Sequence, residues 1–394
     1  MVALLLTLSM SALAQVTTSS MTGKVTLEGS GDEIIGATVV AVHEPSGTRY
    51  NAVTNVNGMF TIQGMRTGGP YNVTVSYIGH QTKTFRGITL QLGETYNLPV
   101  WLNENITDLA EIVVTGTASK FSQERTGAST NINSQQIINL PTVSRSITDV
   151  TRLSPYGGNG MSFAGSDGRT ANFTVDGANF NNNFGLSSNL PGGGNPISID
   201  AIEELQVVIS PYDVRQTNFI GGGVNAITKS GTNTFKGSAY VYHQNENLRG
   251  DAVEREQISG ARDKDSKTTY GFTLGGPIIK DKLFFFANGE MVKTPTVVNR
   301  WRGSENGVAD ADAFLSRTTL SDLEAVSKYV ADKYGYNTGS YSSFPADENN
   351  YKLLARLDWN INDQHHLALR YNYTKNRYWS SPNATSMDGG TRQS

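Results

Sequence analysis

The sequence has no cysteine among its 394 residues, so disulfide bonds and cysteine-ligated metal centres are excluded. It also lacks a basic excess, because 32 lysines and arginines against 35 acidic residues leave a net charge of −3. Nucleic-acid binding requires a basic surface, so this balance argues against a nucleic-acid partner. No segment reaches the roughly 18 consecutive apolar residues of a transmembrane helix. If the chain enters a membrane, it does so with β-strands.

Residues 1–14 are apolar and end in Ala12-Leu13-Ala14, which matches the small-x-small pattern of a signal-peptide cleavage site. The run is too short for a membrane span, and we favour a signal peptide over a buried N-terminal strand. No basic residue precedes the apolar run, so the natural start is expected upstream of Met1. We therefore predict export from the cytoplasm, with mature protein from Gln15.

Residues 20–103 contain short runs of alternating polar and apolar residues, the pattern of a small β-sandwich. Asn57-Gly58 predicts a two-residue hairpin with positive φ at both positions. The expected strands are Thr22–Leu27, Ala37–Val42, Met59–Ile62, Tyr71–Tyr77 and Tyr96–Leu102.

The residues from 126 to 230 predict an α+β domain. Ser134–Leu140 and Ser144–Leu153 have the capping residues and apolar spacing of short helices, and Phe173–Gly177 reads as a strand with a tight turn. Near the end of this region, Gly221–Gly223 places three residues without side chains in a row. Such a run predicts a backbone that passes very close to another wall.

From residue 231 onward the sequence predicts long strands that alternate in polarity. In the fourth, Tyr351, Leu353 and Leu357 share one face while Arg356 and Asp358 share the other. Charged residues at every second position cannot face lipid, so they must face a wet or protein-filled lumen. The expected strands are Phe235–Asn245, Thr268–Ile278, Leu283–Val292, Tyr351–Ile361 and His366–Tyr378.

The connections between these strands alternate in length. Residues 279–282 and 362–365 are short turns, whereas 246–267 and 293–350 are long. This alternation is typical of an outer-membrane barrel, which has turns on one side and loops on the other. The longer loop predicts one helix, Asp322–Tyr334, with Ser321 as its cap.

The amino-acid sequence of several segments resembles that of TonB-dependent receptors of the bacterial outer membrane, most of all the Oar-like subgroup. The resemblance is carried by Asp200-Ala-Ile-Glu-Glu204, Pro211-Tyr-Asp-Val-Arg-Gln216, Ser230-Gly-Thr-Asn233, Gly275-Gly-Pro277 and Leu283-Phe-Phe-Phe-Ala287. Ile35-Gly-Ala-Thr-Val39 and Asn57-Gly-Met-Phe60 are similar to the carboxypeptidase-regulatory-like domain, which commonly precedes the plug in such receptors.

The resemblance implies a mainly β fold with a transmembrane antiparallel barrel, of which this chain holds only the first strands. It implies a signal peptide (1–14), a regulatory-like sandwich (20–103), a linker (104–125), a plug (126–230) and barrel strands (231–394). The implied function is import of an extracellular ligand across the outer membrane with energy transduced by TonB and its inner-membrane complex. The N-terminal domains would lie on the periplasmic side or inside the barrel, and no enzyme activity or cofactor is implied.

Two sets of functional residues follow from the resemblance. The first is a coupling segment that would pair with TonB, comprising Leu109, Glu111, Ile112, Val113, Val114 and Thr115. An exposed β-branched run on a linker suits strand addition to another protein's sheet. The second is a set of asparagines in a loop rich in asparagine and glycine, comprising Asn179, Asn181, Asn182 and Asn183. This loop either faces the outside as part of the ligand site or is mobile filler without a binding role.

Several alternatives stay open at this point. Residues 112–115 are either the coupling segment or the first strand of the plug, and the two readings can be partly true together. The protein is either a transporter or a non-transporting adhesin or structural barrel. His243 and Glu246 match an H-x-x-E zinc motif, with His365 or His366 as a third ligand, but residues three apart on a strand point to opposite faces.

A calcium site at Asp176 and Asn179 has weaker support, because its spacing matches no EF-hand loop. Five strands also leave an open edge, which hydrocarbon penalises strongly. We therefore expect the chain to be a fragment of a longer receptor, and its ligand and full strand count do not follow from this sequence.

Overall fold

The computed structural model divides the chain into two compact units, each considered by itself. One comprises Met1–Ser238, Phe272–Gly289 and Lys352–Thr374, and the other comprises Ala239–Gly271, Glu290–Tyr351 and Lys375–Ser394. The structure describes residues 16–104, 112–115, 128–142, 144–181, 190–191, 193–211, 213–248, 250, 252–253, 256–257, 266–295, 297–299, 302–310, 313, 315–339, 344–345, 347–378, 384–385 and 392–393. The predicted signal peptide lies outside these ranges. Among the residues described, no helix is both long enough and apolar enough to cross a membrane.

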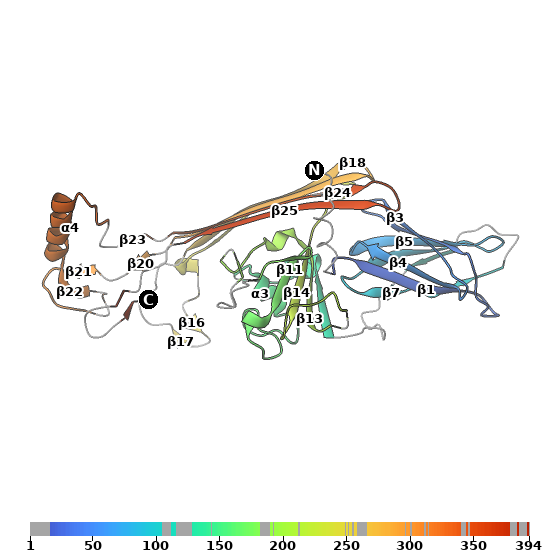
Figure 1. Cartoon of the computed structure of the whole chain (residues 1–394), viewed down its shortest axis with the longest axis horizontal. Coiled ribbons are helices and arrows are strands. Elements are labelled where there is room, and N and C mark those ends of the chain that lie inside the picture. The colour runs from blue at the N-terminus through green and yellow to red at the C-terminus, as the bar shows by residue number, and fades with distance from the viewer. Residues whose placement is uncertain are drawn as a thin grey trace. The chain divides into compact units, whose positions relative to one another are not determined.

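A β-sandwich opens the first unit, as the alternating pattern predicts (Figure 1). One sheet has the order β4-β1-β7, with β8 also paired to β1, and the other has the order β3-β2-β5-β6-β9. Met21, Val39 and Tyr71 are among the side chains fully buried between the two sheets. The strands are β1 Ser19–Leu27, β2 Thr38–His43, β3 Thr48–Val53, β4 Met59–Met65, β5 Gly68–Ser76, β6 Lys83–Leu90, β7 Thr95–Asn97, β8 Val100–Leu102 and β9 Ile112–Thr115.

Three details of the sandwich differ from the prediction. Strands β3 and β6 were not expected, and Tyr96–Leu102 is split into β7 and β8 around Leu98-Pro99. The prediction of a two-residue hairpin at Asn57-Gly58 is wrong, because β3 and β4 belong to different sheets. Only Gly58 has positive φ, 68°, and the connection is organised by Asn55, whose Oδ1 accepts from the backbone N–H groups of Asn57 and Met59. The chain crosses between sheets there, so a two-residue turn would be too short.

An α/β domain follows, with a five-stranded sheet of order β10-β13-β14-β11-β12. Its elements are β10 Ala128–Asn133, α2 Ser134–Asn139, α3 Ile147–Thr151, the 3-10 helices Gly168–Thr170 and Ile199–Ala201, and strands β11 Asn172–Val175, β12 Ala178–Asn179, β13 Ile202–Ser210 and β14 Gly223–Thr228. The two predicted helices are present but shorter. Helix α2 is capped by Asn133, not by Ser134, and ends one residue earlier than predicted, while α3 begins only after its cap Ser146 and ends at Thr151. Strand β14 is buried along its whole length.

The close approach predicted for the triple glycine is confirmed. A Cβ on Gly222 would lie 2.8–2.9 Å from the ring of Phe163, and one on Gly223 would lie 2.9 Å from the ring of Phe219. A Cβ on Gly221 would overlap the side chain of Ser166. The wall that the backbone passes is therefore the domain's own loop 163–166 together with Phe219.

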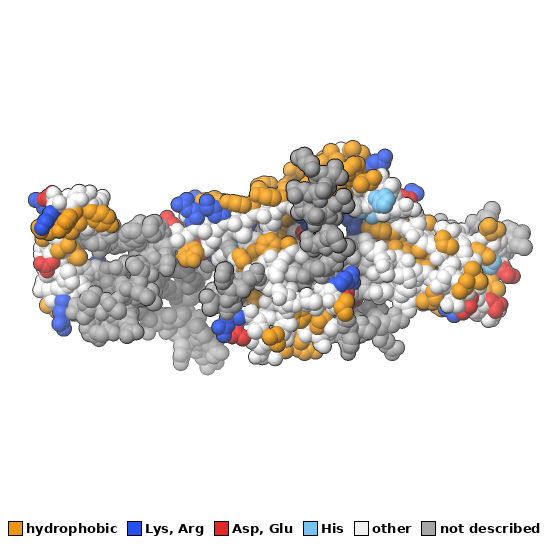
Figure 2. Space-filling view, in the orientation of Figure 1, with side chains coloured by type: hydrophobic (Ala, Val, Ile, Leu, Met, Phe, Trp, Pro, Cys, Tyr) orange, Lys and Arg blue, Asp and Glu red, His pale blue; other side chains and the backbone are white. Residues whose placement is uncertain are grey.

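All five long strands predicted after residue 231 are present, and they form one sheet of order β15-β18-β19-β24-β25. Their bounds are β15 Lys236–Gln244, β18 Lys267–Ile279, β19 Leu283–Thr294, β24 Glu348–Asn360 and β25 His366–Arg377. Figure 2 shows hydrophobic side chains gathered over the region where Figure 1 places β18 and β24.

The second unit carries the long connections. Helix α4, Leu320–Tyr334, begins one residue after its cap, and that cap is Thr319, not Ser321 as expected. The Thr319 side chain accepts from the N–H of Asp322, while Asp322 reaches back to the cap backbone, which completes a capping box. The short strands are β16 Ala252–Val253, β17 Glu256–Gln257, β20 Val297–Asn299, β21 Arg302–Ser304, β22 Leu315–Thr319, β23 Phe344–Pro345, β26 Ala384–Thr385 and β27 Arg392–Gln393.

Candidate functional site: a buried charge network and an edge strand

Strand β24 directs two charged side chains into the protein, because alternate residues of a strand point to opposite faces. Arg356 is 7 % exposed and Asp358 is 5 % exposed, whereas Leu357 between them is 40 % exposed. Arg356 donates to Asp358 through two parallel bonds, Nε to Oδ2 at 2.8 Å and Nη2 to Oδ1 at 2.9 Å. This two-bond arrangement uses the planar fork of the guanidinium and fixes its orientation.

The remaining nitrogen of Arg356 reaches the α/β domain. Its Nη1 donates to the backbone oxygen of Thr228 at 2.5 Å and lies 3.9 Å from Oδ1 of Asp176. Thr228 closes the sheet at the end of β14, and its N–H and hydroxyl both donate to Asp176, at 3.1 and 2.6 Å. Strand β24 is therefore tied to the end of β14 and to the turn after β11.

Asp176 reaches this position because of an unusual backbone. It has φ of 49° and is followed by Gly177 at 85°, so two positive φ values turn the chain sharply between β11 and β12. Aspartate tolerates this left-handed conformation better than most residues do. The predicted strand and tight turn at Phe173–Gly177 thus aim a carboxylate at β24.

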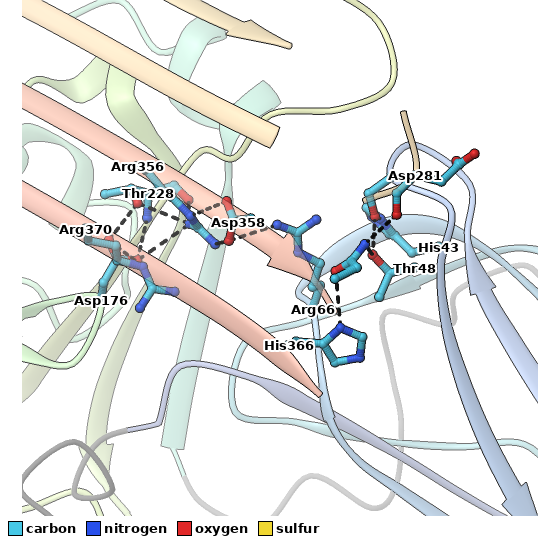
Figure 3. A network of polar contacts seen from close by, with 12 residues as sticks. His43, Thr48, Arg66, Asp176, Thr228, Asp281, Arg356, Asp358, His366 and Arg370 are labelled. Atoms are coloured by element: carbon cyan, nitrogen blue, oxygen red, sulfur yellow. Dashed lines mark hydrogen bonds and ion pairs between the residues drawn. The ribbon is translucent and has the colours of Figure 1, made fainter. Parts of the chain in front are cut away.

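Two more arginines extend the network, as Figure 3 shows. Nη2 of Arg66, just after β4 of the sandwich, lies 3.0 Å from Oδ1 of Asp358. Nε of Arg370, on β25, lies 3.5 Å from Oδ2 of Asp176. The order Arg66–Asp358–Arg356–Asp176–Arg370 alternates in sign, so each buried carboxylate lies between two guanidinium groups. Such pairing offsets the desolvation of buried charge.

A cavity of about 300 Å³ adjoins the network. The residues that line it include His43, Tyr50, Arg66, Glu203, Arg356 and His366. They come from the sandwich, the α/β domain and strands β24 and β25. The cavity therefore lies where these three parts meet. Its lining includes both acidic and basic side chains, together with uncharged polar ones.

A second set of contacts, which we call the Leu92 joint, links the sandwich to the α/β domain through hydrogen bonds of the Leu92 backbone. The N–H of Leu92 donates to Oε1 of Glu204 at 3.0 Å, and its carbonyl accepts from Gln206 at 2.6 Å and from Asn131 at 3.1 Å. Asn131 also donates to Glu204 at 3.1 Å. Burial raises the pKa of the Glu204 carboxyl to about 7 despite these donors, and the nearby Glu94 and Glu203 add to the rise. A carboxyl with this pKa changes charge near neutral pH.

A third joint links the sandwich to the turn regions of the long strands. Nδ1 of His43 and the hydroxyls of Ser46 and Thr48 form a buried chain with two 2.7 Å contacts. Asn360, at the end of β24, donates to the Thr48 hydroxyl at 2.9 Å. Burial, reinforced by the nearby Arg66 charge, lowers the pKa of His43 to about 3. His43 is therefore neutral at physiological pH, which suits a structural hydrogen-bond role.

The predicted coupling segment is partly described. Leu109 and Glu111 lie outside the described residues, whereas the backbone of Ile112–Thr115 forms β9. Strand β9 pairs in parallel with β6 of the sandwich and is the last strand of that sheet. The alternative that these residues are the first strand of the α/β domain is wrong, because in the described part of the chain they pair with β6 of the sandwich, and the α/β domain's sheet is formed by β10 to β14.

The predicted ligand-contacting asparagines divide in the same way. Asn182 and Asn183 lie outside the described residues. Asn179 is exposed on β12, and its Oδ1 accepts from the N–H of Asn181 at 2.8 Å. The Asn181 side chain is used within the domain, accepting from Phe173 N–H at 2.6 Å and donating to Asn172 at 2.7 Å.

The structure brings together none of the metal constellations considered from the sequence. Nδ1 of His243 contacts the Thr268 hydroxyl at 2.8 Å, and Nδ1 of His366 contacts Oδ1 of Asn360 at 3.2 Å. Asp176 is engaged with Thr228 and the two arginines. Within the described ranges, no three histidine, aspartate or glutamate residues are clustered so that they could hold a metal ion.

Two stretches of the chain match known protein families. Residues 20–103 match the family model of the carboxypeptidase regulatory-like domain, and residues 227–301 match that of an outer membrane beta barrel domain. These two matches show a carboxypeptidase regulatory-like domain followed, later in the chain, by part of an outer membrane beta barrel domain. The chain is homologous to the TonB-dependent transporter Oar of Myxococcus xanthus, with 26 % identity over 343 residues. That match covers 82 % of this chain and 30 % of the relative, so the chain spans less than a third of the relative's length.

Among solved structures, the chain resembles the siderophore receptor PirA of Acinetobacter baumannii, with 20 % identity and a TM-score of 0.41. That match covers 64 % of this chain and 32 % of PirA. It also resembles the outer membrane transporter YddB of Escherichia coli, with 14 % identity and a TM-score of 0.42, covering 63 % and 33 % of the two chains.

Sequence reasoning found part of the charge network. It placed Arg356 and Asp358 on an inward face, and the tight turn placed Asp176. It missed Arg66, Glu204 and the contacts at Leu92, because each depends on a single side chain or backbone group without a periodic signal. The hint available in the sequence was that Glu204 and Gln206 share one face of the apolar run Ile202–Ser210, and the structure shows that both are buried.

Proposed function

We propose that this chain forms the regulatory-like sandwich, the plug and part of the barrel wall of a TonB-dependent outer-membrane receptor. In this proposal, residues 20–103 are the sandwich, 104–125 the linker, 126–230 the plug and 231–394 strands of the barrel. The receptor binds an extracellular ligand and imports it with energy supplied through TonB. The homology to the transporter Oar supports the class, while the ligand is not specified by these residues.

One observation carries the proposal: strands β24 and β25 have reversed polarity compared with a water-soluble sheet. On β24, Lys352, Arg356 and Asp358 are buried, while Leu353 and Trp359 are 44 % and 46 % exposed. On β25, Leu367, Leu369 and Tyr371 are 55–65 % exposed. Water would oppose an apolar outer face with a charged inner face, whereas lipid favours it. The apolar face is therefore assigned to lipid and the charged face to the plug.

The buried network gives the plug a specific attachment to the wall. Asp176 and Thr228 of the proposed plug contact Arg356 and Arg370 of the proposed wall. Import requires a path past the plug, so these ion pairs are contacts that a pulling partner has to break or rearrange. The loop that begins at Asn179 is proposed to contact the ligand through Asn179, Asn181, Asn182 and Asn183.

The coupling segment is proposed to be Leu109 and Glu111–Thr115, which pairs with TonB by strand addition. Backbone hydrogen bonds supply the affinity in this mode, so the segment needs an extended conformation more than particular side chains. The described part of the segment, Ile112–Thr115, is already extended as β9.

A topology experiment with introduced cysteines tests the barrel assignment. Because this sequence has no native cysteine, a thiol reagent labels only the introduced residue in it. Val308→Cys lies in a long connection and Asp363→Cys in a short turn, and both positions are exposed. A membrane-impermeant maleimide applied to intact cells is expected to label Val308→Cys and to leave Asp363→Cys unlabelled until the outer membrane is opened. Equal labelling of both on intact cells contradicts the proposal.

A second experiment separates a transporter from a non-transporting adhesin or structural barrel. Deleting residues 109–115 is expected to abolish capture of the receptor by an immobilised periplasmic fragment of TonB, with outer-membrane assembly unchanged. The intact receptor is the control. An adhesin predicts no capture in either case.

A further inference from the structure

Strand β6 of the sandwich has one side satisfied by β5, and β9 covers the other. An uncovered strand edge presents unpaired N–H and C=O groups that readily accept another strand. In this fold the edge is occupied by the same backbone that the proposed function assigns to TonB. Strand β6 and TonB therefore compete for the same backbone, Ile112–Thr115.

The register of the pair is well defined and short. Lys83, Thr84, Phe85 and Arg86 of β6 lie opposite Ile112, Val113, Val114 and Thr115 in parallel. Beyond Arg86 the β5–β6 register shifts, with Phe85 opposite Val73 and Ile88 opposite Tyr71, and Gly87 has φ of 78°. An irregularity of this kind bends a strand and locally disrupts its ladder. The irregularity in β6 directly follows the four residues that pair with β9.

We propose that the edge Lys83–Arg86 of the sandwich is the resting-state binding site of the coupling segment, and that TonB must take the segment from it. This inference rests on the proposed function for the identity of the competing partner. A pairing of four residues has few hydrogen bonds and is weak by itself. Because the segment is tethered to the sandwich, its local concentration at the edge is high.

The position of β9 in the chain gives the reason why release is required. It lies after β8 of the sandwich and before β10 of the α/β domain. While β9 is held on β6, force applied to the segment is borne by the sandwich sheet. Only after β9 leaves β6 does the force reach β10, the edge strand of the proposed plug's sheet, which pairs directly with β13. The docking edge therefore holds the coupling segment in the resting receptor and has to release it before the receptor is energised.

A disulfide lock tests the docking site. Arg86→Cys with Thr115→Cys places two cysteines at partner positions of the parallel pair, and Arg86 is exposed. The control is Thr89→Cys with Thr115→Cys, because Thr89 is also exposed on β6 but lies three residues farther, roughly 10 Å along a strand. A disulfide does not span that distance without backbone movement. Under mild oxidation the first pair is expected to cross-link at least tenfold more than the control, and equal yields overturn the docking site.

The second half of the experiment tests the competition. The oxidised Arg86→Cys/Thr115→Cys receptor is expected to be captured by the periplasmic TonB fragment at least tenfold less than the same protein after reduction. Equal capture of the two forms overturns the requirement for release, since TonB would then bind β9 while it stays on the sandwich. If the unmodified receptor is not captured at all, the proposed function fails, and the cross-linking yield still decides whether β6 binds the segment.

Discussion

Arg356 is a buried guanidinium shared between Asp358 on its own strand and the Asp176–Thr228 pair of the neighbouring domain. Buried ion pairs add little net stability compared with apolar packing, but removing one partner leaves an uncompensated charge. The alternation of three arginines and two aspartates therefore makes each member sensitive to loss of its neighbours.

Replacing Arg356 with methionine is expected to lower the free energy of unfolding by roughly 3–5 kcal/mol, because both aspartates lose a partner. Urea denaturation of the protein in detergent micelles measures the change. Arg49→Met is the matched control, since Arg49 is exposed on β3 and should change stability by under about 0.5 kcal/mol. The double variant Arg356→Met/Asp358→Leu should lose less than Arg356→Met alone. Equal losses would argue against coupling within the network.

Glu204 gives the joint at Leu92 a pH dependence. Its pKa of about 7 in the folded protein lies above its ordinary value of 4.5, so the folded state holds the proton more tightly than the unfolded state. Stability from this group is therefore fully present below pH 4.5, decreases as the pH rises and is lost above about pH 7. A shift of this size corresponds to roughly 3 kcal/mol.

Glu204→Gln keeps the oxygen that accepts from Leu92 and removes the titration. The variant is expected to have a flatter stability profile between pH 4.5 and 7, and to be more stable than the parent at pH 8. Thermal unfolding in detergent across this pH range measures both. A parent and variant with parallel profiles would show that Glu204 does not titrate in this range.

At the scale of elements, the long strands were predictable because their pattern has period two and runs for ten residues or more. Each predicted boundary in this sheet lies within three residues of the observed one. Strands β3 and β6 were missed, since the apolar residues of Thr48–Val53 and Lys83–Leu90 are interspersed with charged and polar ones and form no long alternating run. Whether such a segment forms a strand depends on its neighbours in the sheet and not on its own sequence alone.

The run Gly221–Gly223 shows the reverse, a local signal with a specific tertiary cause. Gly222→Ala is expected to destabilise the α/β domain by about 1–3 kcal/mol, because its Cβ would lie 2.8–2.9 Å from the Phe163 ring. Gly158→Ala is the matched control in the same domain, where the nearest atoms lie at 3.2–3.4 Å. Limited proteolysis and denaturation of both variants measure the difference. Comparable effects from the two substitutions would contradict the crowding argument.

At the scale of the whole molecule, the proposed barrel places the apolar face of β24 and β25 against lipid and their charged face against the plug. Leu369→Arg is expected to impair outer-membrane assembly, because an arginine on the lipid face of a barrel costs up to roughly 2–4 kcal/mol, depending on its depth. Asn372→Arg, on the inward face of the same strand, should assemble normally or nearly so. The fraction of each variant recovered in outer-membrane preparations measures this. The assignment of faces fails if the Asn372 variant is the more impaired.

The sequence by itself determined the polarity of the strands, the order of the domains and the position of the glycine run. These features are local or periodic, so neighbouring residues carry the whole signal. The tertiary structure alone decided that Arg66 meets Asp358, that Leu92 meets Glu204, and that β9 pairs with β6. Each of these contacts joins residues far apart in the chain through single side chains or unpaired backbone. Their pairing depends on which surfaces burial brings together, and no periodic pattern records that.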